Sequence, residues 1–175
     1  MGEYYIGIDL GGTNVKFGLF DKDIKLIAKS STPTNADMGA DVLVQSMGKC
    51  VEQLLMENSL DLDDITSAGL GSPDPARYSE GIIEAATNMP KFKNIPIRDM
   101  LAKRLGKPIV FDNDANVACY GEFAVGAGKD ADNMIFFTLG TGIGGGIVNA
   151  GKLLQGAGDN AAELGHLIVY PGGRQ

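Results

Sequence analysis

The sequence has no tryptophan, and it contains only two cysteines and one histidine. Cys50 and Cys119 lie far apart with no CxxC spacing, which excludes a disulfide framework and favours buried thiols in a reducing compartment. No signal peptide opens the chain, and its most apolar segment, 134–148, is interrupted by glycines and too short to cross a bilayer. We therefore expect a cytoplasmic protein without a membrane partner.

An excess of positive charge is also missing. The chain carries 15 Lys and Arg residues against 22 Asp and Glu residues, a net charge of -7, and no basic cluster interrupts this trend. Because such a surface would repel a phosphate backbone, we expect no nucleic acid as a partner. The 175 residues suffice for one domain, or for one small domain and part of another.

Hydrophobic periodicity predicts a mixed α/β chain. The predicted strands are 4–9, 15–20, 25–31, 65–71, 107–111, 134–138 and 147–148, and the predicted helices are 40–58, 97–105 and 115–124. The segment "SPDPARYSEG" is predicted to be a loop with a small hairpin after it, and Gly106 to stop the second helix.

Two segments follow the same pattern of strand, glycine turn and strand. "IGIDLGGTNVKFGLF" can be laid against "IFFTLGTGIGGGIVN", which pairs Leu10 and Gly11 with Leu139 and Gly140. One such match is common among hairpins, but two hairpins separated by an α/β unit suggest two related lobes. Each turn could offer backbone N–H groups to an anionic ligand, because glycine lets the backbone approach closely.

A dinucleotide fingerprint, GxGxxG, is formed by Gly140, Gly142 and Gly145, and Glu163 lies near the position of a ribose-binding acid. That fingerprint requires a helix after the glycines, whereas "IVNAGK" predicts a strand and a turn. NAD binding is therefore disfavoured. A Walker phosphate loop is absent from the sequence.

The polar segment "FDNDAN", residues 111–116, follows a predicted buried strand and permits two interpretations. It can be a helix cap, with Asp112 accepting hydrogen bonds from the N–H groups that open the next helix. It can also be a site built from two carboxylates and two amides.

Four segments, in this order and at this spacing, resemble the ROK family of sugar kinases and their repressor relatives: "IGIDLGGTNVKFGLF", "VFDNDANVACYGE", "FFTLGTGIGGGIV" and "AAELGHLIVYPGG". The resemblance covers nearly the whole chain, including "GLGSPDPARYSEGIIEAATNMP". It implies the actin-like (ribonuclease H-like) ATPase fold of sugar kinases, with ATP and sugar bound between two lobes. The lobes are expected at 1–111 and 112–175, the second being incomplete.

The resemblance also implies chemical roles. Asp114 is expected to be the general base that accepts the proton of the sugar hydroxyl during phosphoryl transfer, and Asn113 to bind a sugar hydroxyl. Asp9 is expected to organise Mg²⁺ near the phosphates of ATP. The two phosphate-facing turns are expected to consist of Gly11, Gly12 and Thr13, and of Gly140, Thr141 and Gly142. Residues 144–146 receive no role and are expected to form a flexible or tightly packed turn.

Glu163 and His166 match the ExGH pattern of the family, in which both side chains reach the sugar. In many members the same His also binds a structural zinc ion together with three cysteines that lie further along the chain. Neither Cys50 nor Cys119 fits that motif, so zinc at His166 is expected only if the full-length protein has downstream cysteines.

The implied activity is ATP-dependent phosphorylation of a hexose, with glucose as the first expectation and N-acetylmannosamine, fructose or allose as alternatives. Family members are longer, so the chain is expected to be an N-terminal portion, inactive alone, of a protein that forms a dimer or tetramer. A non-catalytic sugar-binding fragment and a sugar-sensing repressor remain alternatives, the second disfavoured by the acidic charge. Asp74 stands where the family usually has Gly, which predicts a different loop or a shifted sugar preference.

Overall fold

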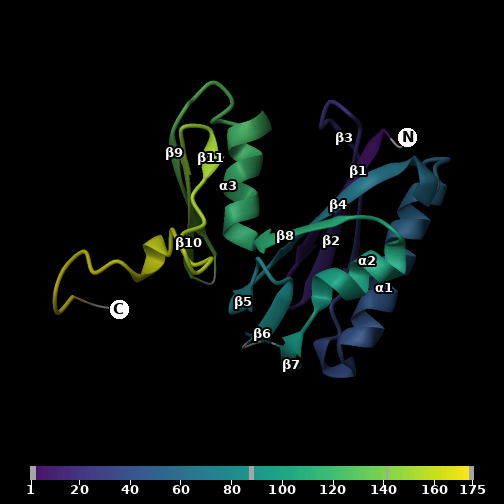
Figure 1. The fold of residues 1–175 in the computed structure, drawn as a ribbon, viewed down its shortest axis with the longest axis horizontal. Helices are drawn as coiled ribbons and strands as arrows, with labels where there is room; N and C mark the ends of the chain where they lie inside the picture. The colour runs from purple at the N-terminus through teal and green to yellow at the C-terminus, as the bar shows by residue number, and fades with distance from the viewer. Residues whose placement is uncertain (1–2, 87–88, 141, 174–175) are drawn as a thin grey trace. The chain divides into compact units, whose positions relative to one another are not determined.

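The computed structural model describes residues 3–86, 89–140 and 142–173. The chain forms two compact units, Met1–Asp114 and Ala115–Gln175 (Figure 1). The lobe boundary predicted after residue 111 stays a prediction, because a compact unit need not coincide with a lobe. Among the described residues, no helix is both long enough and apolar enough to span a membrane.

The first unit is built on a five-stranded sheet with the order β3-β2-β1-β4-β8. β1, β2 and β3 form an antiparallel meander, whereas β4 runs parallel to β1 and β8 runs parallel to β4. The strand bounds are Tyr4–Leu10 (β1), Asn14–Phe20 (β2), Leu26–Pro33 (β3), Ile65–Ser72 (β4) and Ile109–Asn113 (β8). The five strands predicted in this part of the sequence are confirmed, with small differences at their ends.

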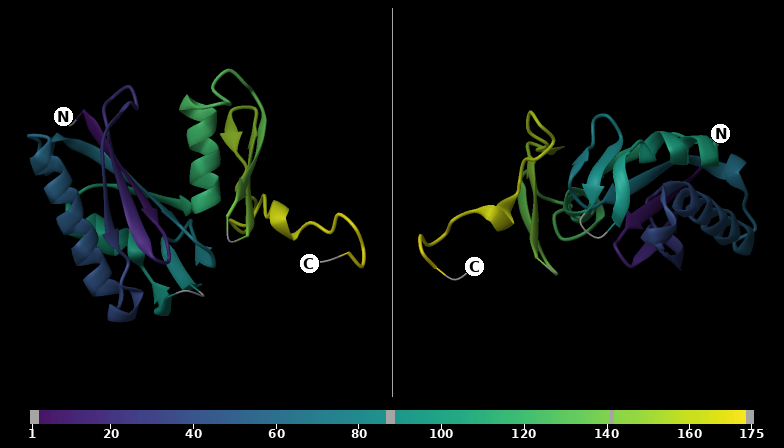
Figure 2. Two further views of the ribbon diagram at one scale, coloured as in Figure 1. Left: turned by 180° about the vertical axis from the view of Figure 1, so that it is seen from behind. Right: turned by 90° about the horizontal axis from the view of Figure 1, so that it is seen from below.

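Helices α1 (Ala40–Glu57) and α2 (Ile97–Leu105) enclose the core of this unit. α1 lies along the sheet in both views of Figure 2, and its apolar residues face inward because they recur at helical spacing. The buried residues of α1 are Leu43, Val44, Met47, Gly48, Val51, Leu54 and Leu55. They join a core with alternate side chains of the strands, such as Ile6 and Ile8 of β1.

A charged contact ties the two helices together. Nη1 and Nη2 of Arg104 donate to the two carboxylate oxygens of Glu52, each at 2.8 Å. These hydrogen bonds lower the pKa of Glu52 and raise the pKa of Arg104, because each stabilises the charged form of its partner. α2 then ends as predicted, since Gly106 adopts a left-handed conformation with φ 66° and donates its N–H to Ala102 O at 2.8 Å.

A second, three-stranded antiparallel sheet follows β4. It contains β5 (Ala76–Arg77), β6 (Ile82–Ala86) and β7 (Met89–Ile95), in the order β5-β6-β7. The hairpin predicted after the loop corresponds to β6 and β7, but the short strand β5 lies inside the segment that was predicted to be a loop. β7 carries two lysines and a proline, and among residues 91–95 the buried Phe92 and the half-buried Ile95 contribute to the core.

The second unit consists of α3 (Asp114–Val125, which begins at the last residue of the first unit) and a sheet with the order β11-β10-β9. The bounds are Met134–Leu139 (β9), Ile143–Asn149 (β10) and Lys152–Leu153 (β11). The expectation of a turn at residues 144–146 was wrong, because these glycines lie inside β10. A Cβ on Gly144 would lie 3.1 Å from that of Ala115, and one on Gly146 would overlap Cys119, so the glycines let α3 pack directly on the strand.

Candidate functional site

Three parallel strands of the first unit end at one edge of the sheet. In the strand register Asp9 of β1 pairs with Gly71 of β4, and Gly71 pairs with Asp112 of β8. Since neighbouring strands lie about 4.8 Å apart, the backbones at Asp9 and Asp112 are roughly 10 Å apart. The predicted Mg²⁺ residue and the predicted sugar-binding segment therefore share one edge.

The turn between β1 and β2 contains Gly11, Gly12 and Thr13. The Gly11 N–H donates to Asn14 O at 3.1 Å, and a Cβ on Gly11 would lie 2.8 Å from the same oxygen, so the tight turn requires glycine there.

Thr34 holds this turn from the end of β3. Its hydroxyl donates to Gly11 O at 2.6 Å, and its N–H donates to Thr13 O at 2.9 Å. Thr34 is 1% exposed, so both bonds are shielded from water. The sequence interpretation missed Thr34, because nothing in a Thr three residues past a predicted strand marks a long-range contact.

Asp9 is exposed and forms an ion pair with Lys16, its cross-strand neighbour, at 3.3 Å between Oδ2 and Nζ. Both side chains are more than half exposed, so the pair adds little to stability. Carboxylate oxygens are ligands that suit Mg²⁺, and this carboxylate is accessible from solvent. Asp9 and the neighbouring backbone turn thus fit a magnesium-phosphate group in donor chemistry.

The junction of β8 and α3 carries the polar segment singled out in the sequence. Asn113 ends β8 and Asp114 begins α3. The Asn113 N–H donates to Asp112 Oδ1 at 2.8 Å. Asn113 is half-buried and Asp114 is exposed, which leaves the candidate base accessible at the start of the helix.

The loop after β4 contacts Asn113 directly. Nδ2 of Asn113 donates to Asp74 Oδ2 at 2.6 Å, and the Tyr78 hydroxyl donates to Asp74 Oδ1 at 2.8 Å. Tyr78 is 3% exposed, and its ring packs on Phe111 with 5.0 Å between centroids. Burial, and next the nearby Asp74, raise the pKa of Tyr78 far above its ordinary value.

Tyr78 was also missed by the sequence interpretation. The only available signal was an aromatic residue four positions after Asp74 in a segment otherwise typical of a loop.

The second glycine turn lies between β9 and β10 in the second unit. Gly140 donates its N–H to Gly142 O at 2.9 Å, and a Cβ on either glycine would meet no described atom within 4 Å. Close packing therefore does not explain these two glycines. Thr141, the third residue predicted in this turn, lies outside the described residues.

Glu163 precedes a short 3-10 helix, η3 (Leu164–His166), and His166 is its last residue. Their side chains approach to 3.9 Å between Oε2 and Nε2, and both are exposed. The turn is anchored on β10, because a Cβ on Gly145 would lie 2.8 Å from the Leu164 side chain. The candidate sugar residues are thus divided between the units, with Asn113 in the first and Glu163 and His166 in the second.

Zinc does not fit the side chains around His166. Within 3–86, 89–140 and 142–173, no group of three or more His, Cys, Asp or Glu residues could hold a metal ion. Cys119 is buried against β10, where burial raises the pKa of its thiol and so disfavours the thiolate that zinc binds.

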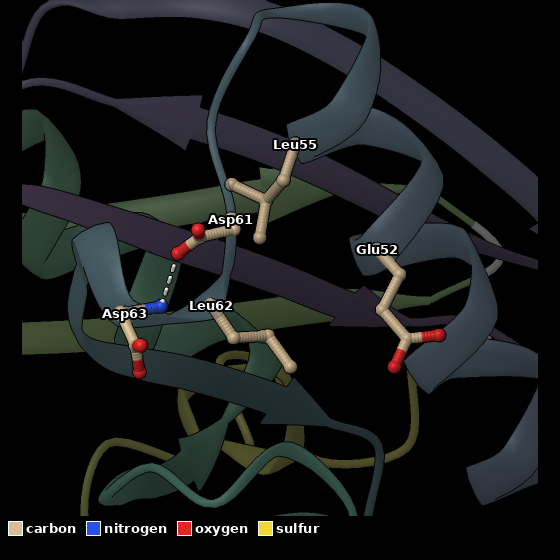
Figure 3. A pocket seen from close by; sticks show the side chains of 5 residues that line it. All are labelled: Glu52, Leu55, Asp61, Leu62 and Asp63. Carbon is tan, nitrogen blue, oxygen red and sulfur yellow. Dashed lines mark hydrogen bonds between the residues drawn. The ribbon is translucent and has the colours of Figure 1, made fainter.

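A surface hollow of about 320 Å³ in the first unit is lined by none of these residues. Figure 3 shows its lining, which is Glu52, Leu55, Asp61, Leu62 and Asp63. Its acidic rim has a structural explanation, since Asp61 and Asp64 form a capping box on the short helix η2 (Leu62–Asp64).

Comparison with known proteins places the chain in a family. The model of the ROK family matches residues 5–175. The glucokinase of Thermotoga maritima is 39% identical over 168 residues, which cover 96% of this chain and 51% of the relative. The chain spans about half the length of the curated relatives it matches.

Solved structures show the same fold. The ROK hexokinase from Thermus thermophilus superposes with a TM-score of 0.86 and 34% identity, over 98% of this chain and 55% of the other. The ROK family glucokinase from Streptomyces griseus, in complex with glucose and AMPPNP, gives 0.81 and 32%, over 96% and 51%. The fold is therefore the mixed α/β fold of the ROK sugar kinases, which is the actin-like ATPase fold, and the chain belongs to the ROK family.

Proposed function

We propose that the protein to which this chain belongs transfers the γ-phosphoryl group of ATP to a hexose, with glucose as the substrate. The observation that carries the proposal is the junction of β8 and α3, where an amide and an accessible carboxylate, Asn113 and Asp114, follow one another at the carboxyl edge of parallel strands. Ligands of open α/β sheets bind at this edge. The similarity to glucokinases at 32–39% identity supports the same class of reaction.

Asp114 is the proposed general base. It would accept the proton of the attacking sugar hydroxyl, which increases nucleophilicity as the bond to phosphorus forms. Asn113 would hold a neighbouring hydroxyl, and Glu163 and His166 are further proposed sugar ligands. An amide is suited to this work because it both donates and accepts hydrogen bonds, as a hydroxyl does.

The phosphates of ATP are the proposed ligands of the two glycine turns. Gly11, Gly12 and Thr13 belong to one turn, and Gly140, Thr141 and Gly142 to the other. Asp9 would hold Mg²⁺, which supplies positive charge to the phosphate oxygens when it is bound. The Thr34 bonds keep the first turn in one conformation before ATP arrives, which reduces the entropy lost on binding.

The alternative substrates are N-acetylmannosamine, fructose and allose, and the alternative role is sugar binding without catalysis. The contact of Asp74 is the observation that favours considering another sugar, because its carboxylate accepts a hydrogen bond from Asn113, the proposed sugar ligand. A hexose panel separates these possibilities.

The test is ADP release, coupled to a spectroscopic reporter, by the full-length protein with each sugar in turn. Asp114→Asn should lower kcat by on the order of a hundredfold or more and leave the sugar affinity within a few-fold, since the amide keeps polarity but cannot act as a base. Asp23→Asn, a matched loss of charge in the exposed turn after β2, should leave kcat unchanged. Turnover of Asp114→Asn equal to that of Asp23→Asn would contradict the assignment of the base.

A further inference from the structure

The β4–β5 loop and the end of β8 form a small polar network in the first unit. Asp74 accepts at both carboxylate oxygens, from Asn113 Nδ2 at 2.6 Å and from the Tyr78 hydroxyl at 2.8 Å. The Tyr78 oxygen also lies 3.2 Å from Ser72 O and 3.5 Å from Asn113 Nδ2. The three side chains therefore form a closed triangle in which each touches the other two.

Tyr78 is the fixed residue of this network. Its side chain is buried against Phe111, so it cannot swing into solvent without opening the core. Burial together with the nearby carboxylate raises the pKa of Tyr78, so the hydroxyl keeps its proton and remains a donor to Asp74 at physiological pH.

The carboxylate of Asp74 determines which way the Asn113 amide faces. An ionised carboxylate only accepts hydrogen bonds, whereas an amide group offers a donor end and an acceptor end. The –NH₂ end of Asn113 must therefore face Asp74. Because Nδ2 and Oδ1 are bonded to the same planar carbon, the carbonyl oxygen Oδ1 then points away from the Asp74 carboxylate.

We propose that Asp74 is a positioning residue that fixes the orientation of the Asn113 amide, so that Asn113 presents its Oδ1 to the sugar and accepts from a hydroxyl that donates. This inference rests on the proposed function, in which Asn113 binds the sugar. It assigns a chemical preference to the subsite: an unsubstituted hydroxyl is bound, whereas an O-acyl, O-alkyl or fluoro group at that ring position is rejected, because none of these can donate to Oδ1.

Asp74→Asn is the most informative variant because it keeps the shape of the side chain. Its own amide can donate or accept, so the two facing amides of residues 74 and 113 can both flip and still remain hydrogen-bonded. The orientation of Asn113 is then no longer dictated. Tyr78→Phe is the matched control, since it disturbs the same loop but retains the contact between the carboxylate and the amide.

The experiment measures Kd and KM of the full-length protein for glucose and for its monodeoxy-monofluoro analogues, each with one ring hydroxyl replaced by fluorine. In the wild type, one position should show a penalty of about ten- to hundredfold, the cost of an unmet hydrogen bond in a polar site. Asp74→Asn should reduce the penalty at that position to within a few-fold and leave the other positions unchanged. Tyr78→Phe should retain the wild-type pattern.

Equal fluorine penalties in wild type and Asp74→Asn would overturn the inference while leaving the kinase proposal intact. Loss of the position-specific penalty in Tyr78→Phe would also overturn the inference and leave the kinase proposal intact, since general damage to the loop would then explain the effect. Failure of the wild type to bind or phosphorylate any hexose would overturn the proposed function instead.

A second readout requires no sugar. The side-chain –NH₂ resonances of Asn113, assigned by NMR in the sugar-free protein, should shift in Asp74→Asn and in Asp74→Ala and stay close to the wild-type values in Asp23→Asn. Unchanged resonances in both Asp74 variants would show that Asp74 does not hold the amide, and would overturn the inference whatever the kinetics show.

Discussion

Replacing Thr34 with valine tests whether one buried hydroxyl holds the turn between β1 and β2. The substitution keeps the shape of the side chain but removes the 2.6 Å hydrogen bond to Gly11 O, while the Thr34 N–H can still donate to Thr13 O. Thr34 is 1% exposed, so water cannot replace the lost donor without local opening.

The magnitude follows from two opposing contributions. Leaving a buried carbonyl without this donor costs about 1–3 kcal/mol. The added methyl group returns at most about 0.8 kcal/mol through apolar burial. From the middle of the first range, about 2 kcal/mol, less the contribution of the methyl group, we expect the free energy of unfolding to fall by about 1–2 kcal/mol.

Urea unfolding followed by circular dichroism measures this difference, provided that the slope of the transition is unchanged. Thr32→Val is the matched control: Thr32 lies in β3, two residues before Thr34, is half-buried, and its hydroxyl lies 3.4 Å from Ser46 Oγ, a long contact. Its effect should stay within about 0.5 kcal/mol. In the full-length protein Thr34→Val should also raise KM for ATP several-fold and leave KM for the sugar unchanged. Equal stabilities of the two variants would refute the idea that Thr34 holds the turn.

Two further predictions concern packing and charge. Because the hydrogen bonds from Arg104 lower the pKa of Glu52 in the folded state, the stabilisation by this pair is present above the ordinary glutamate pKa of about 4.5 and is lost as the pH falls through the lower folded value. Urea unfolding of wild type and Glu52→Gln, measured between about pH 7 and pH 3, tests this. The free energies of unfolding should differ by up to about 1 kcal/mol at neutral pH, since Glu52 is partly exposed, and should converge in acid. A difference that stays constant with pH would contradict this. Gly146→Ala should destabilise the second unit by about 1–3 kcal/mol, because the new Cβ would overlap Cys119. Gly158→Ala is the control: its Cβ would meet no described atom within 4 Å, so it should change thermal unfolding little. Equal melting temperatures of the two variants would count against close packing of α3 on β10.

Local patterns in the sequence were sufficient for most secondary structure. The alternation in "YYIGIDL" and "NVKFGLF" predicts the first hairpin, because one face of each strand is buried. The helical spacing from Leu43 to Leu55 predicts α1 for the same reason. β10 was predicted too short, since three glycines in a row are typical of a turn. Close contacts explain them in a strand: Gly144 and Gly146 pack against α3, and Gly145 packs against Leu164.

The candidate site was less predictable than the elements that carry it. Family motifs marked Asp9, Asn113 and Asp114, but they did not indicate that Asp74 would accept from Asn113. Those two residues are 39 positions apart in the chain, and their contact depends on how the β4–β5 loop folds back over the end of β8. Thr34 and Gly11, 23 positions apart, are a similar case.

The sequence by itself determined the alternation of strands and helices, the glycine turns, the acidic charge and the motifs of the family, because each of these depends on residue type and on short-range spacing. The tertiary structure alone decided which strand ends meet at one edge, which way the Asn113 amide faces, and which glycines serve close packing rather than ligand approach. These features depend on contacts between residues that are distant in sequence, whose geometry is set only when the sheets and helices pack together.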